Sequence, residues 1–138
     1  MRRAAVAAAL AAALFGATTW LALEGRDVAV LRTGPPPGRE TRVWVAEAEG
    51  ALWLEAATPE RAWYRDALAD PAVALEHRGA VRRYRARPEP GAEGHARIRS
   101  LLRAKYGWAD AWVGLLQDTS RSIAVRLDPA PEPAAGTF

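Results

Sequence analysis

The stretch TPERAWYRDALADPAVALEHRG, residues 58–79, decides the fold. It predicts a short amphipathic helix that is followed at once by a strand. Thr58 is the expected N-cap, and Pro59 suits the first helical position because a proline there gives up no hydrogen bond. The helix is expected to stop before Pro71, which disfavours helical geometry at Asp70 and has no backbone N–H to donate. This order of helix, stop and strand is the most informative pattern in a sequence without a catalytic triad or metal-binding motif.

β-Branched and aromatic residues on both sides of this stretch predict further strands. Six strands are expected, at residues 27–32, 42–47, 51–57, 73–77, 81–87 and 122–127. The second and third should form a hairpin between Val43 and Leu54, with Trp44 and Trp53 packing across it. The fourth and fifth should form another hairpin.

Two helical segments are expected in the second half of the chain. Residues 92–105 predict a helix with a narrow apolar stripe, made of Ile98, Leu101 and Leu102. A break is expected at Gly107, and the short helix after it should stack one apolar face, made of Trp108, Trp112 and Leu115. Strands with helices after the third and the fifth indicate a small, mostly antiparallel barrel or half-open sheet. The fold class expected is therefore mostly β with α insertions.

The amino-terminal segment differs from the rest of the chain. Arg2 and Arg3 precede an uncharged run at 4–23, which is about long enough to cross a bilayer core as a helix, because each residue adds ~1.5 Å. The paired arginines favour a cytoplasmic amino terminus, with Trp20 at the far interface. A cleaved signal peptide needs small residues before its cleavage site, and a buried helix needs a polar face; neither is evident here. Residues 1–23 are thus expected to be a single-pass membrane anchor, with the domain outside the cytoplasm.

Composition limits what the remaining residues can form. Residues 24–129 suffice for one domain, and the proline-rich segment 130–138 is expected to be a disordered tail. Without cysteine, the chain has no disulfide, zinc–thiolate site or thiol nucleophile, and His77 and His95 lack metal-ligand spacing. The net charge of +3 is carried almost wholly by arginine, since Lys105 is the single lysine. Guanidinium groups suit phosphate or carboxylate ligands, although a solvated surface explains the same bias. Tethering to a membrane argues against nucleic acid as a partner.

The order of elements resembles the split β-barrel flavoproteins, and more closely the deazaflavin-dependent nitroreductase family. Residues 61–71, RAWYRDALADP, resemble a family segment of the form Pro-x-Trp-Tyr-x-Asn-Leu-x-Ala-Asn-Pro, with Asp66 and Asp70 where asparagine is usual. Residues 106–110, YGWAD, resemble a Tyr-Gly-Tyr-Ala-Asp stretch, and 121–125, RSIAV, resemble the closing Arg-x-Ile-Pro-Val strand. The likeness covers nearly the whole domain. It implies a small six-stranded antiparallel split β-barrel, a fold that often forms dimers, so a homodimer is also expected.

The resemblance also implies a cofactor site. In the family, the loop after the first strand binds the phosphate tail of the cofactor; here it reads TGPPPGR, residues 33–39, and its three prolines lack amide donors. Arginines are the expected substitutes, and Arg65-Asp66, which replace a histidine-asparagine pair, are expected to pair with each other. The cofactor-binding residues implied are Thr33, Gly34, Gly38, Arg39, Arg42, Trp63, Tyr64 and Arg65. The substrate-pocket residues implied are Tyr106 and Trp108. The aromatic members of both sets also suit a packing role in the core.

Two functions are compatible with these features. Hydride transfer from a reduced flavin or deazaflavin needs little acid–base help from the protein, so no catalytic residue is expected. The first hypothesis is a membrane-anchored reductase that uses deazaflavin or flavin mononucleotide (FMN) to reduce a small acceptor such as a quinone. The second is a non-catalytic split barrel with a degenerate cofactor loop, which binds a ligand or partner near the membrane. The element order favours the first, and the predicted orientation of the anchor favours the second.

Overall fold

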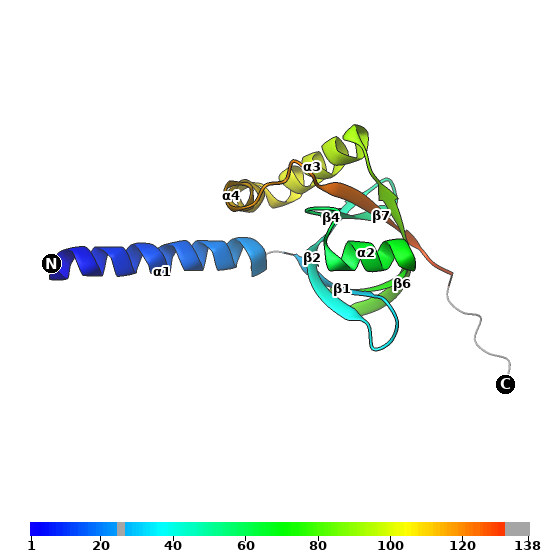
Figure 1. The fold of residues 1–138 in the computed structure, drawn as a ribbon, viewed down its shortest axis with the longest axis horizontal. Helices are drawn as coiled ribbons and strands as arrows, with labels where there is room; N and C mark the ends of the chain where they lie inside the picture. Colours follow the sequence, from blue (N-terminus) through cyan, green and yellow to red (C-terminus); the bar gives the residue numbers. More distant parts are fainter. Residues whose placement is uncertain (25–26, 132–138) are drawn as a thin grey trace.

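The computed structural model describes residues 1–24 and 27–131. Its seven antiparallel strands form one curled sheet, a split half-barrel, in the order β2-β1-β5-β6-β7-β4-β3 (Figure 1). The strands are β1 (Val28–Thr33), β2 (Arg39–Trp44), β3 (Ala46–Ala48), β4 (Ala51–Ala56), β5 (Ala72–His77), β6 (Ala80–Glu89) and β7 (Ile123–Pro129). The helices of the described ranges are α1 (Arg2–Glu24), α2 (Ala62–Ala69), α3 (Ala92–Tyr106) and α4 (Trp108–Leu116). Most of the predicted tail, 132–138, lies outside the described residues.

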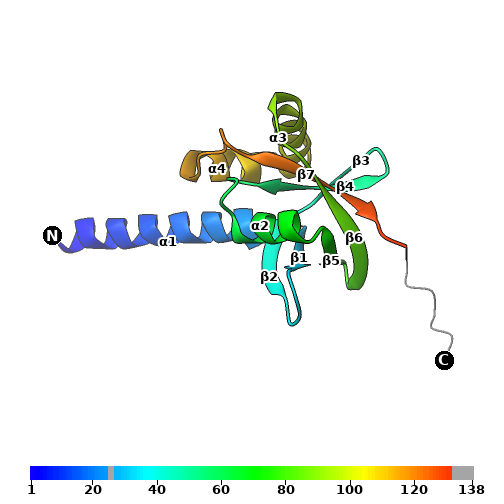
Figure 2. The ribbon, with the colours of Figure 1, turned by 45° about the vertical axis from the view of Figure 1, so that its right-hand side comes forward.

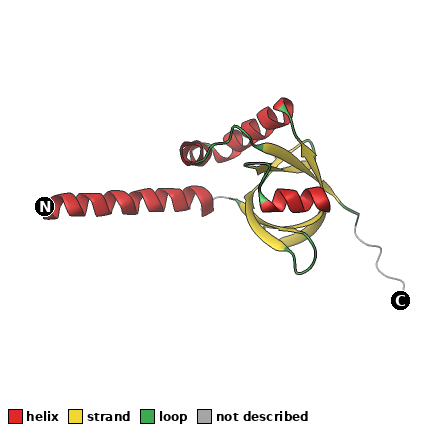
Figure 3. Ribbon diagram, in the orientation of Figure 1, coloured by secondary structure: helices red, strands yellow, loops and turns green. Residues whose placement is uncertain are grey.

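The sheet buries apolar side chains on both faces. Figure 3 shows α2 on the concave side of the curled sheet, where it buries Trp63, Tyr64 and Ala67. The sheet residues of this core include Leu31, Leu54, Leu75, Val125 and Leu127. A second core forms between the other face and the pair α3 and α4, and includes Trp53, Ile98, Leu102, Tyr106 and Ala124. Because Leu54 and Val125 are neighbours of Trp53 and Ala124 along their strands, the alternation of side chains places the two cores on opposite faces.

The expected central helix forms, but it begins later than the sequence indicates. α2 starts at Ala62, and Arg61 rather than Thr58 is its N-cap, without a side-chain hydrogen bond. Thr58 instead belongs to a turn, where its carbonyl accepts a hydrogen bond from the N–H of Arg61 at 3.3 Å. The expected stop is confirmed, since Asp70 has an extended backbone and its carboxylate accepts a hydrogen bond from the N–H of Ala72 at 3.0 Å.

The predicted strand at 42–47 is two strands, which is why the sheet has seven strands instead of six. Val45 separates β2 from β3 and is fully buried. Its N–H donates to the Tyr106 hydroxyl at 3.0 Å, and its carbonyl accepts a hydrogen bond from Lys105. Side chains of α3 thus satisfy the backbone groups that a neighbouring strand would otherwise pair. The chain can therefore leave one edge of the sheet and reappear at the other.

This break overturns the expected hairpin between Val43 and Leu54. Val43 pairs with β1, whereas Leu54 pairs with β7, so the two residues lie in different parts of the sheet. Trp44 and Trp53 accordingly do not face each other across a hairpin. Trp44 stacks on Tyr106 with 4.3 Å between ring centroids, and Trp53 is fully buried in the second core. The hairpin expected from the fourth and fifth strands is confirmed as β5 and β6.

Gly94 lies where α3 passes the end of β6 too closely for any side chain. A Cβ atom added there would lie 2.1 Å from the carbonyl oxygen of Glu89. Gly94→Ala is therefore expected to lower the free energy of unfolding by about 2 kcal/mol or more, because the backbone of β6 or α3 must shift. Gly114→Ala on α4 is the matched control, since nothing lies within 4 Å of a Cβ added there. Urea denaturation of the two variants measures the difference, and equal midpoints would contradict the close approach.

Asp27 ties the segment after α1 to the barrel. Its carboxylate accepts from Lys105 Nζ at 2.8 Å and from Arg78 at 3.0 Å, and lies 2.8 Å from His77 Nε2. Its carbonyl accepts a hydrogen bond of 2.6 Å from the Tyr106 hydroxyl. Burial alone raises the pKa of Asp27, but Lys105 and His77 outweigh burial and lower the pKa to about 2.

The lowered pKa of Asp27 predicts a pH-dependent contribution to stability. Because the pKa of Asp27 in the folded protein lies below its ordinary value of 3.8, this contribution to stability is fully present above about pH 4 and disappears as the pH falls towards 2. Asp27→Asn is expected to lower the free energy of unfolding by ~2 kcal/mol at pH 7, at 1.36 kcal/mol per pKa unit. Denaturation curves of both proteins between pH 7 and 2 measure this difference. A difference that stays constant over this range would contradict the assigned ion pairs.

Candidate functional site

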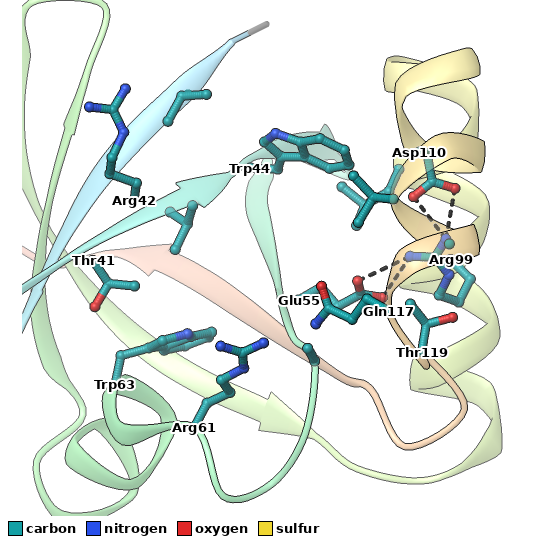
Figure 4. A pocket seen from close by; sticks show the side chains of 16 residues that line it. Thr41, Arg42, Trp44, Glu55, Arg61, Trp63, Arg99, Asp110, Gln117 and Thr119 are labelled. Atoms are coloured by element: carbon teal, nitrogen blue, oxygen red, sulfur yellow. Dashed lines mark hydrogen bonds and ion pairs between the residues drawn. The ribbon is translucent and has the colours of Figure 1, made fainter. Parts of the chain in front are cut away.

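An open cavity of about 320 Å³ lies between β2, β4, α2 and α4 (Figure 4). Its volume is at the lower end of the range of small-molecule sites. The lining residues include Thr41, Arg42, Trp44, Arg61, Trp63 and Gln117. They come from elements far apart in the sequence, and the curl of the sheet brings them together.

Aromatic and positively charged side chains line much of this cavity. Trp63 of α2 is almost fully buried in the core and meets the Tyr64 ring edge-on at 6.2 Å, which fixes its orientation. Trp44 lies across the cavity, held by its stacking on Tyr106. Figure 4 shows the guanidinium of Arg61 beside Trp63, and Arg42 on β2. Such a pairing of aromatic rings with guanidinium groups suits a planar ligand that carries negative charge.

A buried ionic triad forms the opposite wall. Arg99 of α3 donates from Nη1 to both carboxylate oxygens of Glu55, at 3.0 and 2.9 Å, and from Nη2 to both oxygens of Asp110, at 2.8 and 2.7 Å. The side chains of Arg99, Glu55 and Asp110 are 16%, 13% and 4% exposed. Burial alone lowers the pKa of Arg99, but the two carboxylates outweigh burial and raise it. The triad therefore holds a permanent positive charge between two carboxylates.

The predicted phosphate loop converges on a carboxylate of the protein itself. The Thr33 hydroxyl donates to Asp66 Oδ2 at 3.0 Å, and Arg39 Nε donates to the same oxygen at 2.8 Å. Gly34 has a φ of +79°, and a Cβ there would lie 3.6 Å from that oxygen. Hydrogen bonds from Arg39 and Thr33 lower the pKa of Asp66, so it stays ionised. The expected pairing of Asp66 with Arg65 is thus wrong, and Arg65 lies exposed on α2.

The loop also has few amide donors for an anion. Residues 35–37 are prolines, and the N–H of Gly38 donates to the carbonyl of Pro35 at 2.8 Å. The Thr33 hydroxyl, the Arg39 Nε–H and the Gly38 N–H therefore already have partners within the protein. Asp66 and Trp63 stand one turn apart on α2, so the loop lies close to the cavity without forming its wall.

The structure divides the predicted site residues into separate groups. Arg42 and Trp63 line the cavity, whereas Thr33, Gly34, Gly38 and Arg39 belong to the loop. Tyr64 is buried in the first core and Tyr106 in the second. Trp108 is 49% exposed on α4. Neither Tyr106 nor Trp108 lines the described cavity.

Sequence reasoning missed Arg61, Glu55 and Arg99 as cavity residues. The sequence could have indicated Arg61, because this residue is the first of the segment that resembles the family. Glu55 and Arg99 had none, because the two residues are 44 positions apart and meet only when α3 folds over the sheet. The YGWAD motif included Asp110, but the sequence did not indicate that Arg99 is its partner.

Comparison with known proteins places the chain among deazaflavin enzymes. A sequence profile of the family described as "F420H(2)-dependent quinone reductase" matches residues 8–129. The comparison with curated proteins gave no match.

Solved structures share the fold at low sequence identity. A protein described as F420 reductase is 19% identical, with 80% of this chain and 93% of that one covered and a TM-score of 0.51. A putative pyridoxamine 5'-phosphate oxidase of Listeria innocua is 14% identical, with 80% and 89% covered and a TM-score of 0.55. A structure described as a domain-swapped dimer is 20% identical, with 75% and 81% covered and a TM-score of 0.56. At these identities the likeness establishes the split-barrel fold alone.

Proposed function

Because the chain belongs to the F420H(2)-dependent quinone reductase family, we propose that it is a deazaflavin-dependent oxidoreductase that reduces a small quinone-type acceptor. The observation that carries this proposal is the cavity, which is lined by two aromatic and two cationic side chains, Trp44, Trp63, Arg42 and Arg61. A reduced deazaflavin, when bound, supplies a hydride, and the protein then has only to position the two reactants.

The residues present fit the ring of such a cofactor better than they fit its usual phosphate contacts. Trp63 offers a fixed aromatic wall for a planar ring. The loop cannot bind a phosphate in the usual way, because Arg39 and Thr33 already donate hydrogen bonds to Asp66. We therefore assign the acidic part of the cofactor to Arg61, with Arg42 of β2 as a second basic side chain of the cavity. Between them, these side chains would orient the ring and balance its charge.

Asp66 is expected to weaken the binding of any anionic cofactor, because its carboxylate repels a phosphate near the loop. Asp66→Asn should release Arg39 and strengthen deazaflavin binding severalfold, measured by quenching of cofactor fluorescence. Asp70→Asn removes the same charge four residues further along the chain and is the matched control. Weaker binding by the Asp66 variant would mean that this carboxylate organises the site.

The neutralised loop favours a second candidate function. A split barrel whose phosphate loop is closed by its own carboxylate could serve as a non-catalytic domain that binds a ligand or partner near the membrane. Turnover separates the two. We expect the chain to oxidise reduced deazaflavin only when a quinone is added, with Trp63→Ala slowing the reaction; no turnover with any quinone would leave the non-catalytic function.

We also propose that α1 is a retained membrane anchor. Its Arg2–Ala22 segment is long and apolar enough to span a bilayer, with a mean hydropathy of 1.8. Helix α4 packs on it: Trp112 donates to Thr19 at 3.1 Å and lies 5.6 Å from the Phe15 ring. Cleavage as a signal peptide would remove both partners of Trp112.

The orientation and assembly of the chain follow as further proposals. Arg2 and Arg3 favour a cytoplasmic amino terminus and a domain, residues 24–129, on the other side of the membrane. Protease treatment of intact cells tests this, since the domain should be cut from outside. A homodimer stays a prediction, supported by the domain-swapped dimer among similar structures.

A further inference from the structure

Helix α4 presents its apolar face away from the barrel. The sequence predicts that Trp108, Trp112 and Leu115 share this face, and the structure buries the opposite residues, Ala109 and Asp110. Leu115 is 81% exposed and Trp108 49% exposed. Leu116 beside them is 50% exposed. So large an apolar surface on a nine-residue helix indicates that something other than water covers it.

The position of α4 beside α1 indicates what covers it. In Figures 1 and 2, α4 lies on the side of the barrel from which α1 projects, and Figure 1 views α4 end-on while α1 runs across the page. The two helices therefore cross, and they meet where Trp112 contacts Phe15 and Thr19. Ala22, one turn further along α1, is fully buried.

The position of the contact along α1 determines how deep in the membrane α4 would cross α1. At ~1.5 Å per residue, Phe15 lies about 12 Å and Thr19 about 6 Å from the end of the apolar run at Leu23. A helix lying in the plane of a membrane interface buries its apolar face about 5–10 Å into the boundary between headgroups and acyl chains. A crossing helix held at this depth cannot avoid the lipid if α1 spans the bilayer.

We propose that the face of α4 formed by Trp108, Leu115 and Leu116 inserts into the membrane interface and places the cavity at the lipid boundary. This proposal rests on the anchor proposed above. The opposite side of the same helix lines the cavity through Val113 and Gly114. A lipid-soluble acceptor therefore reaches the cavity past α4 from the bilayer, without crossing water. The surface thus specifies an apolar acceptor drawn from the membrane.

Site-directed spin labelling of the full chain in phosphatidylcholine vesicles tests this surface. The chain has no cysteine, so each cysteine introduced is unique. The labelled variants are Leu115→Cys on α4, Val6→Cys on α1 and, as matched control, Leu68→Cys, which replaces an exposed leucine of α2. Collisions of each label are measured with oxygen, which concentrates in lipid, and with a water-soluble nickel chelate.

We expect the ratio of oxygen to nickel collisions to be severalfold higher at 115 and at 6 than at 68. Equal ratios at 115 and 68 would overturn the proposal, as would a label at 6 that reports water. A low collision rate with both reagents at 115 would also overturn the proposal. It would indicate that a second copy of the chain, and not lipid, covers this face of α4. Titration of the same vesicles with deazaflavin tests the proposed function separately. If deazaflavin does not bind, the collision ratios still show whether α4 lies in the membrane.

Discussion

Replacing Arg99 with methionine is expected to lower the free energy of unfolding by about 3–5 kcal/mol, because it leaves two buried carboxylates without their partner. Glu55 and Asp110 are 13% and 4% exposed, so water cannot replace the guanidinium. Chemical denaturation of the detergent-solubilised chain measures the loss.

Two controls separate burial from charge. Arg121→Met breaks an ion pair with Glu60 in which both side chains are more than half exposed, and we expect a loss below about 1 kcal/mol. Adding Glu55→Gln and Asp110→Asn to the Arg99 variant should recover much of the stability, since no unpaired charge then stays buried. Equal losses for the Arg99 and Arg121 variants would contradict the triad.

The second large effect concerns binding. Arg61→Ala is expected to weaken deazaflavin binding about 10- to 100-fold, since a hydrogen bond to a charged group is worth about 1.5–3 kcal/mol. Arg65→Ala is the matched control, because Arg65 is exposed on the same helix but outside the cavity lining. Fluorescence titration measures both variants. A weaker affinity for the Arg65 variant than for the Arg61 variant would place the anion contact on the outer face of α2.

Local patterns predict the elements of this fold, and non-local contacts decide their arrangement. The stop at Asp70-Pro71 and the β5–β6 hairpin depend on neighbouring residues, so the sequence alone indicates both. The break at Val45 depends on Tyr106, 61 residues away, whose hydroxyl takes the place of a neighbouring strand. Nothing in the local sequence of residues 42–47 indicates this contact. For that reason a single continuous strand was expected there.

The same limit explains which site residues the sequence could indicate. Resemblance to the family identified Arg42 and Trp63, which line the cavity, and the loop at 33–39, which does not. Asp66 was seen as a departure from the family, but its partner Arg39 lies 27 residues away and became apparent only in the fold. The sequence correctly predicted which residues of α4 share an apolar face. It did not predict that this face points away from the barrel and towards α1, because that orientation depends on the packing of α4 against α1.

The affinity for deazaflavin tests the central claim most directly. The full chain in detergent micelles is titrated with deazaflavin and, separately, with FMN, and quenching of cofactor fluorescence is recorded. We predict saturable deazaflavin binding with a dissociation constant in the tens of micromolar or below, abolished or strongly weakened by Arg61→Ala. Absence of saturable binding by the unmodified chain would contradict a cofactor role for the cavity.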